Sequence, residues 1–258
     1  MRSLAVGLTT LVIAISAMAS IKTQAIEYKQ GDTVLEGFLA YDDSQTGTRP
    51  GVLVVHEWWG LNDYAKHRAE MLAELGYVAF CVDMFGKGVV AKTPEEAGAQ
   101  AGKLRADRPL VRARAQAGLD IFKQQLNVDA EKIAVIGYCF GGMVALELAR
   151  SGADVDGVVS FHGSLNTPNT EDAKNIKAKI LVLHGADDPN VKPDEVAAFE
   201  QEMREGAVEW QLFKYGGAVH AFTNPAAGND PSRGAAYNEK ADKRSWEAMK
   251  NFFVEIFK

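Results

Sequence analysis

Short apolar runs alternate with segments of helical spacing along most of this chain. Residues 51–56 (GVLVVH) and 132–136 (KIAVI) are continuously apolar, as expected of strands that are covered on both faces. Strands of this kind alternating with helices predict an α/β fold, with a mostly parallel central sheet and helices on both faces. An early antiparallel hairpin is predicted to contain the strand at residues 34–41. The other predicted strands cover residues 51–56, 77–82, 132–136, 155–160, 180–184 and 208–213. Helices are predicted for residues 63–75, 141–150, 195–204 and 240–257, and residues 93–125 are predicted to be helical with interruptions at Gly98, Gly102 and Pro109.

Composition narrows the classes of function. The chain has 258 residues, a net charge of −6 and two cysteines. A mildly acidic chain offers no broad basic surface for nucleic acid, and two cysteines cannot build a disulfide scaffold or a thiolate-rich metal site. Because no repeat, low-complexity tract or linker divides the chain, we expect residues 20–258 to form one domain. We also expect the protein to be a monomer.

The first 19 residues are predicted to be a signal peptide. Residues 4–19 are apolar and uncharged, and Ala17-Met18-Ala19 gives the small-residue pattern that signal peptidase reads. The run is short for a spanning helix, which needs about 20 apolar residues. An uncleaved anchor is the alternative interpretation. We expect export, to a bacterial periplasm, and no stable membrane association after cleavage.

The strongest chemical motif joins a predicted strand to a predicted helix. Gly137-Tyr138-Cys139-Phe140-Gly141-Gly142 has the glycine–x–nucleophile–x–glycine form of a nucleophile elbow, with cysteine as the nucleophile. The elbow would place the sulfur of Cys139 at a helix N-terminus, where the helix dipole stabilises thiolate, and would direct the amide of Phe140 at an oxyanion. A nucleotide-binding turn is the alternative, but the G-x-G-x-x-G spacing is missing.

An acid and a histidine follow in the chain order that this motif requires. Asp188 comes after the strand at residues 180–184, and it is preferred to the neighbouring Asp187 because it stands directly before Pro-x-Val. His220 lies in a loop of glycines and small residues after the last predicted strand. We expect His220 to act as general base and the acid to orient it.

The remaining histidines have simpler interpretations. His56, His162 and His184 end or follow apolar strands and are interpreted as hydrogen-bonding groups near the site, and His67 lies on a helix face. Asp83 is interpreted as a turn residue. No metal-ligand spacing is present among these residues, so we predict neither a metal nor a cofactor.

Four motifs, taken in order, resemble the dienelactone hydrolase family. They are His56-Glu57-Trp58-Trp59-Gly60, GYCFGG, HGADDPNV and VHAF, and the similarity extends from about Gly31 onward. The resemblance implies an α/β-hydrolase fold and a Cys-His-Asp triad. The enzyme it implies is a carboxylic ester or lactone hydrolase of the carboxymethylenebutenolidase type, acting on a small molecule through an acyl-enzyme thioester.

The resemblance also assigns roles to residues. Cys139 matches the family nucleophile, His220 the histidine and Asp188 the aspartate. Glu57 matches a glutamate that partners the cysteine before substrate binds, and the amides of Trp58 and Phe140 match the oxyanion hole. A carboxylate near the thiol would raise the pKa of the thiol or take its proton.

One position departs from the family pattern. The family holds a substrate carboxylate with two arginines, and the position of the one that follows the histidine is Asn224 here. An asparagine lacks the charged, bidentate grip of a guanidinium. Arg105 and Arg108 lie nearby in the sequence as candidates for substrate binding, without a motif that fixes them.

Two other functions remain open from the sequence. A binding protein could keep this fold without catalysis. The presence of all four matched residues, which are Cys139, His220, Asp188 and Glu57, argues against that alternative. A thiol redox protein could use Cys81 and Cys139, but the expected sheet order separates their strands by one strand, or about 9.6 Å. A disulfide requires Cα atoms within about 7 Å, which disfavours pairing.

Overall fold

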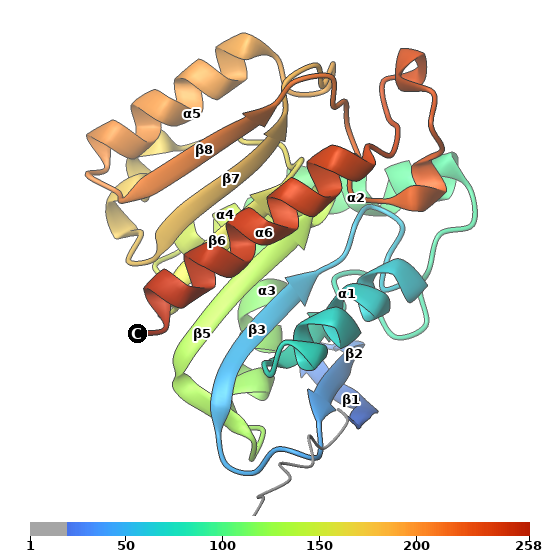
Figure 1. Ribbon diagram of the computed structural model, residues 1–258, viewed down its shortest axis with the longest axis vertical. Helices are drawn as coiled ribbons and strands as arrows, with labels where there is room; N and C mark the ends of the chain where they lie inside the picture. Colours follow the sequence, from blue (N-terminus) through green and yellow to red (C-terminus); the bar gives the residue numbers. More distant parts are fainter. Residues whose placement is uncertain (1–19) are drawn as a thin grey trace, which may run out of the picture.

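The computed structural model describes residues 20–258, which build one sheet with helices on both faces (Figure 1). The predicted signal peptide, residues 1–19, lies outside the described residues, so cleavage and export stay predictions. Within residues 20–258 no helix is long and apolar enough to cross a membrane. The strands are β1 (Ile21–Gln30), β2 (Thr33–Asp42), β3 (Arg49–Val55), β4 (Val78–Val82), β5 (Val128–Tyr138), β6 (Gly157–Phe161), β7 (Lys179–Gly185) and β8 (Trp210–Tyr215). The α-helices are α1 (Asp63–Glu74), α2 (Pro94–Ala106), α3 (Arg108–Lys123), α4 (Phe140–Arg150), α5 (Pro193–Glu205) and α6 (Glu239–Ile256), and the 3₁₀ helices are η1 (Thr170–Asn175), η2 (Pro225–Ala227) and η3 (Pro231–Arg233).

The sheet has the strand order β1-β2-β4-β3-β5-β6-β7-β8. Strands β3 to β8 are parallel, whereas β1 and β2 form an antiparallel hairpin at one edge and β2 pairs antiparallel with β4. The predicted α/β architecture and the early hairpin are therefore confirmed. Because the carboxyl ends of the parallel strands share one edge, the loops that follow them meet there.

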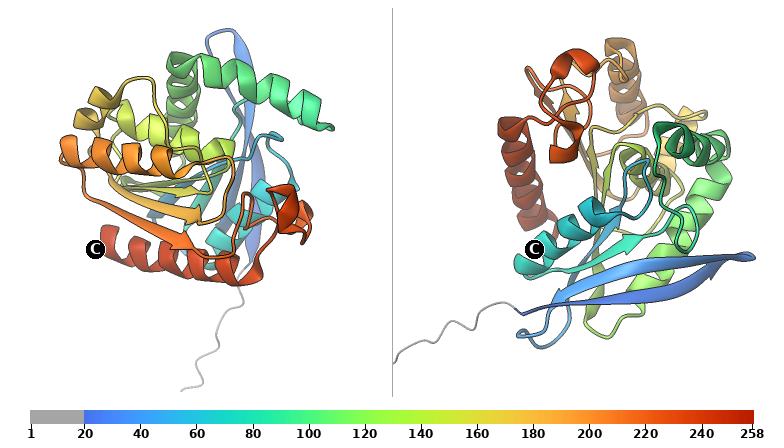
Figure 2. Two further views of the ribbon diagram at one scale, coloured as in Figure 1. Left: turned by 90° about the horizontal axis from the view of Figure 1, so that it is seen from above. Right: turned by 90° about the vertical axis from the view of Figure 1, so that its right-hand side faces the viewer.

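The central strands are apolar throughout because each face of the sheet packs against its own hydrophobic core. Val52 and Val54 of β3 face the core beneath α1 and α6, whereas Leu53 and Val55 face the core beneath α3, α4 and α5. Figure 2 shows the sheet between these two helical layers. Successive side chains of a strand point to opposite faces, so a strand that is covered twice must be apolar throughout.

Two local features refine the predictions. No strand is predicted for β1, because its sequence IKTQAIEYKQ is mostly exposed and lacks an apolar run. The interrupted helical segment predicted for residues 93–125 is two helices, which meet at Asp107. The Asp107 side chain accepts from the Leu110 amide at 3.0 Å and so caps α3, and Pro109 occupies its first turn.

Candidate active site

Cys139 occupies the sharp turn between β5 and α4. Its backbone has φ 55° and ψ −114°, a conformation that non-glycine residues rarely adopt. The flanking glycines are sterically required: a Cβ on Gly137 would lie 1.9 Å from the Gly141 carbonyl oxygen, and one on Gly141 would lie 2.3 Å from the Val55 carbonyl oxygen. The predicted elbow is therefore present, and it holds a nucleophilic side chain at the start of a buried helix.

Cys139, His220 and Asp188 form one hydrogen-bonded line. His220 Nε2 lies 3.0 Å from Cys139 Sγ, and His220 Nδ1 lies 2.8 Å from Asp188 Oδ2. The three residues follow β5, β8 and β7 at the shared carboxyl edge of the sheet. Nδ1–H can donate only to the carboxylate, which leaves Nε2 facing the sulfur.

The two neighbouring aspartates have different partners. Asp188 is buried, and its second oxygen accepts from the Asn190 amide at 2.8 Å. Asp187 is exposed, and it accepts from the Gly217 amide at 2.9 Å. The geometry thus brings Asp188, and not Asp187, to the imidazole.

The charge around His220 favours its protonated form. Burial alone would lower the pKa of His220, but the neighbouring sulfur of Cys139 and the hydrogen-bonded carboxylate of Asp188 raise this pKa well above its ordinary value. An imidazolium hydrogen-bonded to a cysteine stabilises thiolate, which is the nucleophilic form of the side chain.

Trp58 and Phe140, whose amides the family resemblance matches to the oxyanion hole, follow β3 and begin α4. Amides in the first turn of a helix have no partner within the helix. Within residues 20–258 neither amide donates to a protein acceptor outside the regular helix and strand ladders. Both are available as donors beside the elbow.

Glu57 is buried and held by Asn224. Asn224 Nδ2 donates to Glu57 Oε2 at 2.6 Å, and Asn224 Oδ1 accepts from the Ala226 amide at 2.9 Å. Burial raises the pKa of Glu57 to about 7, against the lowering effects of this hydrogen bond and of the positive charges of His220 and Arg68. The structure therefore places the Asn224 side chain on the glutamate, so its amide is already engaged.

Arg105 and Arg108 lie on the α4 side of the elbow. The guanidinium of Arg105, an exposed residue, lies 5.9 Å from the ring centre of Phe140. Arg108 donates to the Met143 sulfur and, at 3.1 Å, to Asn166 Oδ1. Within residues 20–258 neither arginine makes an ion pair with a carboxylate.

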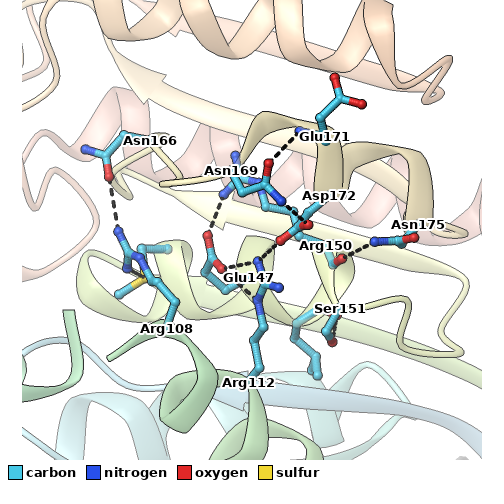
Figure 3. Close-up of polar contacts among 12 residues, drawn as sticks. Arg108, Arg112, Glu147, Arg150, Ser151, Asn166, Asn169, Glu171, Asp172 and Asn175 are labelled. Atoms are coloured by element: carbon cyan, nitrogen blue, oxygen red, sulfur yellow. Dashed lines mark hydrogen bonds and ion pairs between the residues drawn. The ribbon is translucent and has the colours of Figure 1, made fainter. Parts of the chain in front are cut away.

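Figure 3 shows a charge network that joins Arg112, Glu147, Arg150 and Asp172. Arg150 is fully buried and contacts Glu202 at 2.7 Å and Glu147 at 3.1 Å. Arg112 also bonds Glu147, at 2.8 Å. Arg150 further donates to the Leu165 carbonyl at 2.8 Å. This network fixes α4, and with it the elbow, against the loop that follows β6.

His162 is hydrogen-bonded at both ring nitrogens beside the site, in agreement with its interpretation as a hydrogen-bonding group there. Its ring is fully buried and lies edge-on to His220 with ring centres 5.3 Å apart, and its backbone φ is 40°. Nδ1 accepts from the Cys139 amide at 3.2 Å, and Nε2 lies 2.7 Å from Thr223 Oγ1. The available signal was its position directly after the apolar strand β6, at the edge where the site forms.

Asp83, His56 and His184 differ in their hydrogen-bond partners. Asp83 accepts from the amides of Phe85 and Gly86, in agreement with its interpretation as a turn residue. His56 bonds at both nitrogens, to the Glu57 carbonyl and the Met84 amide. His184 differs, because its buried Nδ1 has no partner among the described residues.

Both cysteines are free. Cys81 is fully buried on β4 and donates its S–H to the Ala65 carbonyl at 3.2 Å, and burial raises the pKa of its thiol. Strand β3 lies between β4 and β5, as predicted. This arrangement disfavours the dithiol redox interpretation.

Comparisons with known proteins identify the family of the chain and its fold. The model of the dienelactone hydrolase family matches residues 35–257. A relative from Aquifex aeolicus that carries a carboxymethylenebutenolidase name is 30% identical over 240 residues, covering 91% of this chain and 99% of the relative. The crystal structure of P91, a dienelactone hydrolase-like promiscuous phosphotriesterase from metagenomic libraries, has a TM-score of 0.88 and 42% identity, covering 92% of this chain and 98% of P91. A dienelactone hydrolase structure from Klebsiella pneumoniae, at 21% identity and a TM-score of 0.76, covers 91% of this chain and 99% of its own and shows the shared fold.

Proposed function

The chain belongs to the dienelactone hydrolase family and is an ester or lactone hydrolase, and from this premise we propose that Cys139 is its nucleophile, His220 its general base and Asp188 the residue that orients the base. The observation that carries the proposal is the double contact of His220, 3.0 Å from the Cys139 sulfur and 2.8 Å from Asp188. An activated nucleophile requires a base within hydrogen-bond reach and a third group that orients this base.

In the first half-reaction the Cys139 sulfur attacks the carbonyl carbon. The carbon–oxygen π pair moves onto the oxygen, where the amides of Trp58 and Phe140 stabilise the negative charge. The intermediate then collapses with cleavage of the ester carbon–oxygen bond. His220 gives its proton to the departing alkoxide, leaving a thioester on Cys139 and neutral imidazole.

In the second half-reaction water replaces the alcohol. Neutral His220 takes a proton from water as its oxygen attacks the thioester carbonyl. The carbon–sulfur bond breaks, and the sulfur leaves as thiolate beside the imidazolium. For a lactone, the alcohol stays attached to the acyl chain, so a single hydroxy acid is released.

Glu57 supplies a second proton-accepting group in the same site. With a pKa of about 7, its carboxyl group exchanges protons at neutral pH, and Asn224 stabilises the charged form by donating to it. We propose that Glu57 partners the thiol before substrate arrives, as its match to the family glutamate implies.

Neutral esters and lactones are the substrates best supported by the site. Asn224 lacks charge and is already bonded to Glu57, so it does not supply a cation for a substrate carboxylate. Arg105, whose guanidinium lies 5.9 Å from the Phe140 ring centre, is a candidate for that role.

Phosphotriester hydrolysis is a second candidate activity. It is supported by the 42% identity to P91 over 92% of this chain. A phosphotriester is neutral and would present its phosphoryl oxygen to the same two amides. Attack by Cys139 would release an alcohol and leave a phosphoryl thioester for water to hydrolyse.

The test is turnover by the purified protein on a matched panel. The panel contains a neutral p-nitrophenyl ester, a neutral lactone, a carboxylate-bearing dienelactone and a neutral phosphotriester, each with wild type and Cys139→Ala. We expect turnover of neutral esters or lactones that Cys139→Ala abolishes, with a mass increase on Cys139 that matches the acyl group after rapid quenching. Equal turnover by the alanine variant would refute the proposed mechanism.

A further inference from the structure

We propose that His162 and Thr223 are positioning residues, which tie the nucleophile elbow to the loop that carries His220. The inference rests on the proposed function, because it explains how Cys139 and His220 are kept in contact. Neither residue is assigned a contact with the substrate.

The ring of His162 is fixed in one tautomer by its contact with the elbow. The Cys139 amide can only donate, so His162 Nδ1, which accepts from it at 3.2 Å, carries no proton. Burial, together with the positive charges of His220 and Arg68, lowers the pKa of His162 well below its ordinary value. The ring is therefore neutral, and its proton is on Nε2.

That proton reaches the histidine loop. His162 Nε2–H donates to Thr223 Oγ1 at 2.7 Å, and Thr223, which is fully buried, lies three residues after His220. Thr223 is itself held on two further sides. The Tyr64 hydroxyl lies 2.6 Å from Thr223 Oγ1, and Arg68 donates to the Thr223 carbonyl at 2.7 Å.

The connection joins two strained turns. Cys139 has φ 55° on the elbow, and Ala221, next to His220, has φ 56° on the loop. Strained backbone persists only where the surroundings over-determine it. The bridge from the Cys139 amide through His162 to Thr223 supplies such a restraint on both turns, across the 3.0 Å contact between Cys139 Sγ and His220 Nε2.

A simpler interpretation is that His162 is a satisfied core histidine that stabilises the fold only. The two interpretations differ in what they predict for kcat. Loss of a positioning bond lowers kcat and leaves KM unchanged, because misplaced reacting atoms affect the chemical step. Loss of a purely stabilising bond lowers the melting temperature and leaves both kinetic constants unchanged.

The decisive variants remove one hydroxyl at a time. Thr223→Val keeps the side-chain shape but removes the acceptor for His162, whereas Thr223→Ser restores it. Thr167→Val is the matched control, because the buried Thr167 hydroxyl has no partner among the described residues. We expect kcat on a neutral ester to fall about tenfold in Thr223→Val with unchanged KM, the cost of one hydrogen bond. We expect Thr223→Ser and Thr167→Val to stay within about twofold of wild type.

A second readout does not depend on the substrate. The rate of Cys139 alkylation by iodoacetamide, followed by mass spectrometry of the labelled peptide, reports the contact between thiol and imidazole. Cys81 is fully buried and serves as the internal unlabelled cysteine. We expect slower alkylation in Thr223→Val, and also in His162→Asn, whose side-chain oxygen can accept from the Cys139 amide but cannot reach Thr223.

The outcomes separate the two proposals. Wild-type kcat and wild-type alkylation in both Thr223→Val and His162→Asn would overturn the positioning role. A fall in Thr223→Val that Thr223→Ser does not reverse would overturn it as well. If no substrate is turned over by wild type, the proposed function fails, and the alkylation rates still decide between positioning and simple packing.

Discussion

Asn224 donates a 2.6 Å hydrogen bond to Glu57, from a position 167 residues further along the chain. The bond holds a buried carboxyl group, whose pKa is raised to about 7 by burial, within electrostatic reach of His220. It therefore links the loop after β3 to the loop after β8.

The raised pKa of Glu57 should make the stability of the protein depend on pH. This pKa is about 7 in the folded protein and 4.5 ordinarily, so folding favours the neutral form. This contribution is fully present below about pH 4.5 and is lost as the pH rises through 7. Glutamine at position 57 stays neutral at every pH. The free energy of unfolding of Glu57→Gln should therefore exceed that of wild type by an amount that grows to on the order of 3 kcal/mol above pH 8. Urea unfolding at several pH values measures it, with the exposed Glu131→Gln as control. A difference that does not vary with pH would contradict the prediction.

Replacing the nucleophile should separate thiol chemistry from hydroxyl chemistry. Cys139→Ala should lose turnover and keep wild-type circular dichroism. Cys139→Ser should keep weak esterase activity, because a serine hydroxyl needs stronger base assistance than a thiol. Iodoacetamide should inactivate wild type and leave the residual activity of the serine variant unaffected. Inactivation of the serine variant by the same reagent would point to another essential thiol.

The two adjacent aspartates allow a matched comparison. Asp188→Asn removes the carboxylate that orients His220, and we expect kcat to fall by about 10² to 10⁴, the range seen when a triad acid is replaced by its amide. Asp187→Asn should stay within a few-fold, because Asp187 is exposed and bonds only the Gly217 amide. Steady-state kinetics on one ester measures both. Equal losses in the two variants would mean that the loop as a whole, rather than one carboxylate, matters.

Substrate charge should respond to position 224. Asn224→Arg would bring a guanidinium beside Glu57, and a charge-assisted hydrogen bond to a substrate carboxylate contributes about 1.5–3 kcal/mol. We expect the ratio of kcat/KM for a carboxylate-bearing ester to that for a neutral ester to rise about tenfold or more. Asn224→Gln is the uncharged control. If the ratio is unchanged and wild type already prefers the anionic ester, another cation binds the substrate carboxylate. Arg105→Ala would then be the variant to measure.

The buried charge network of Figure 3 should govern stability rather than chemistry. Arg150→Met leaves Glu147 and Glu202 without their fully buried partner, and we expect a loss of about 3–5 kcal/mol in the free energy of unfolding. Lys243→Met removes an exposed pair with Glu239, and we expect it to leave the free energy of unfolding nearly unchanged. Chemical denaturation measures both. Similar small losses in the two variants would show that the network is replaceable.

Much of the fold could be predicted because strand polarity reports burial. The continuous apolar runs identified the strands that both cores cover, and glycine spacing around Cys139 identified the elbow, where only a missing Cβ fits. Strand β1 could not be predicted in this way, because it is mostly exposed. It is an exposed edge strand, held by backbone pairing with β2, and backbone pairing leaves little trace in side-chain polarity.

Long-range partners were the part of the site that sequence could not supply. The motifs indicated Cys139, Asp188 and His220 separately. No local sequence pattern shows that His162 accepts a hydrogen bond from the Cys139 amide or that Asn224 donates one to Glu57. Such contacts depend on which strands end side by side. His162 and Thr223 are 61 residues apart and meet only because β6 and the loop after β8 reach the same edge of the sheet.

The wide separation of these contacts along the chain also bears on how the protein acquires its activity. The site closes contacts between Glu57 and Asn224, 167 residues apart, and between Cys139 and His220, 81 residues apart. Closing such distant pairs is the slow, entropically costly part of folding. Local helices and the β1–β2 hairpin can form early, but none of them by itself brings Cys139 to His220 or Asn224 to Glu57. Enzymatic competence therefore arises only with the final assembly of the chain, so regain of turnover during renaturation marks completed folding more strictly than recovered helical signal does.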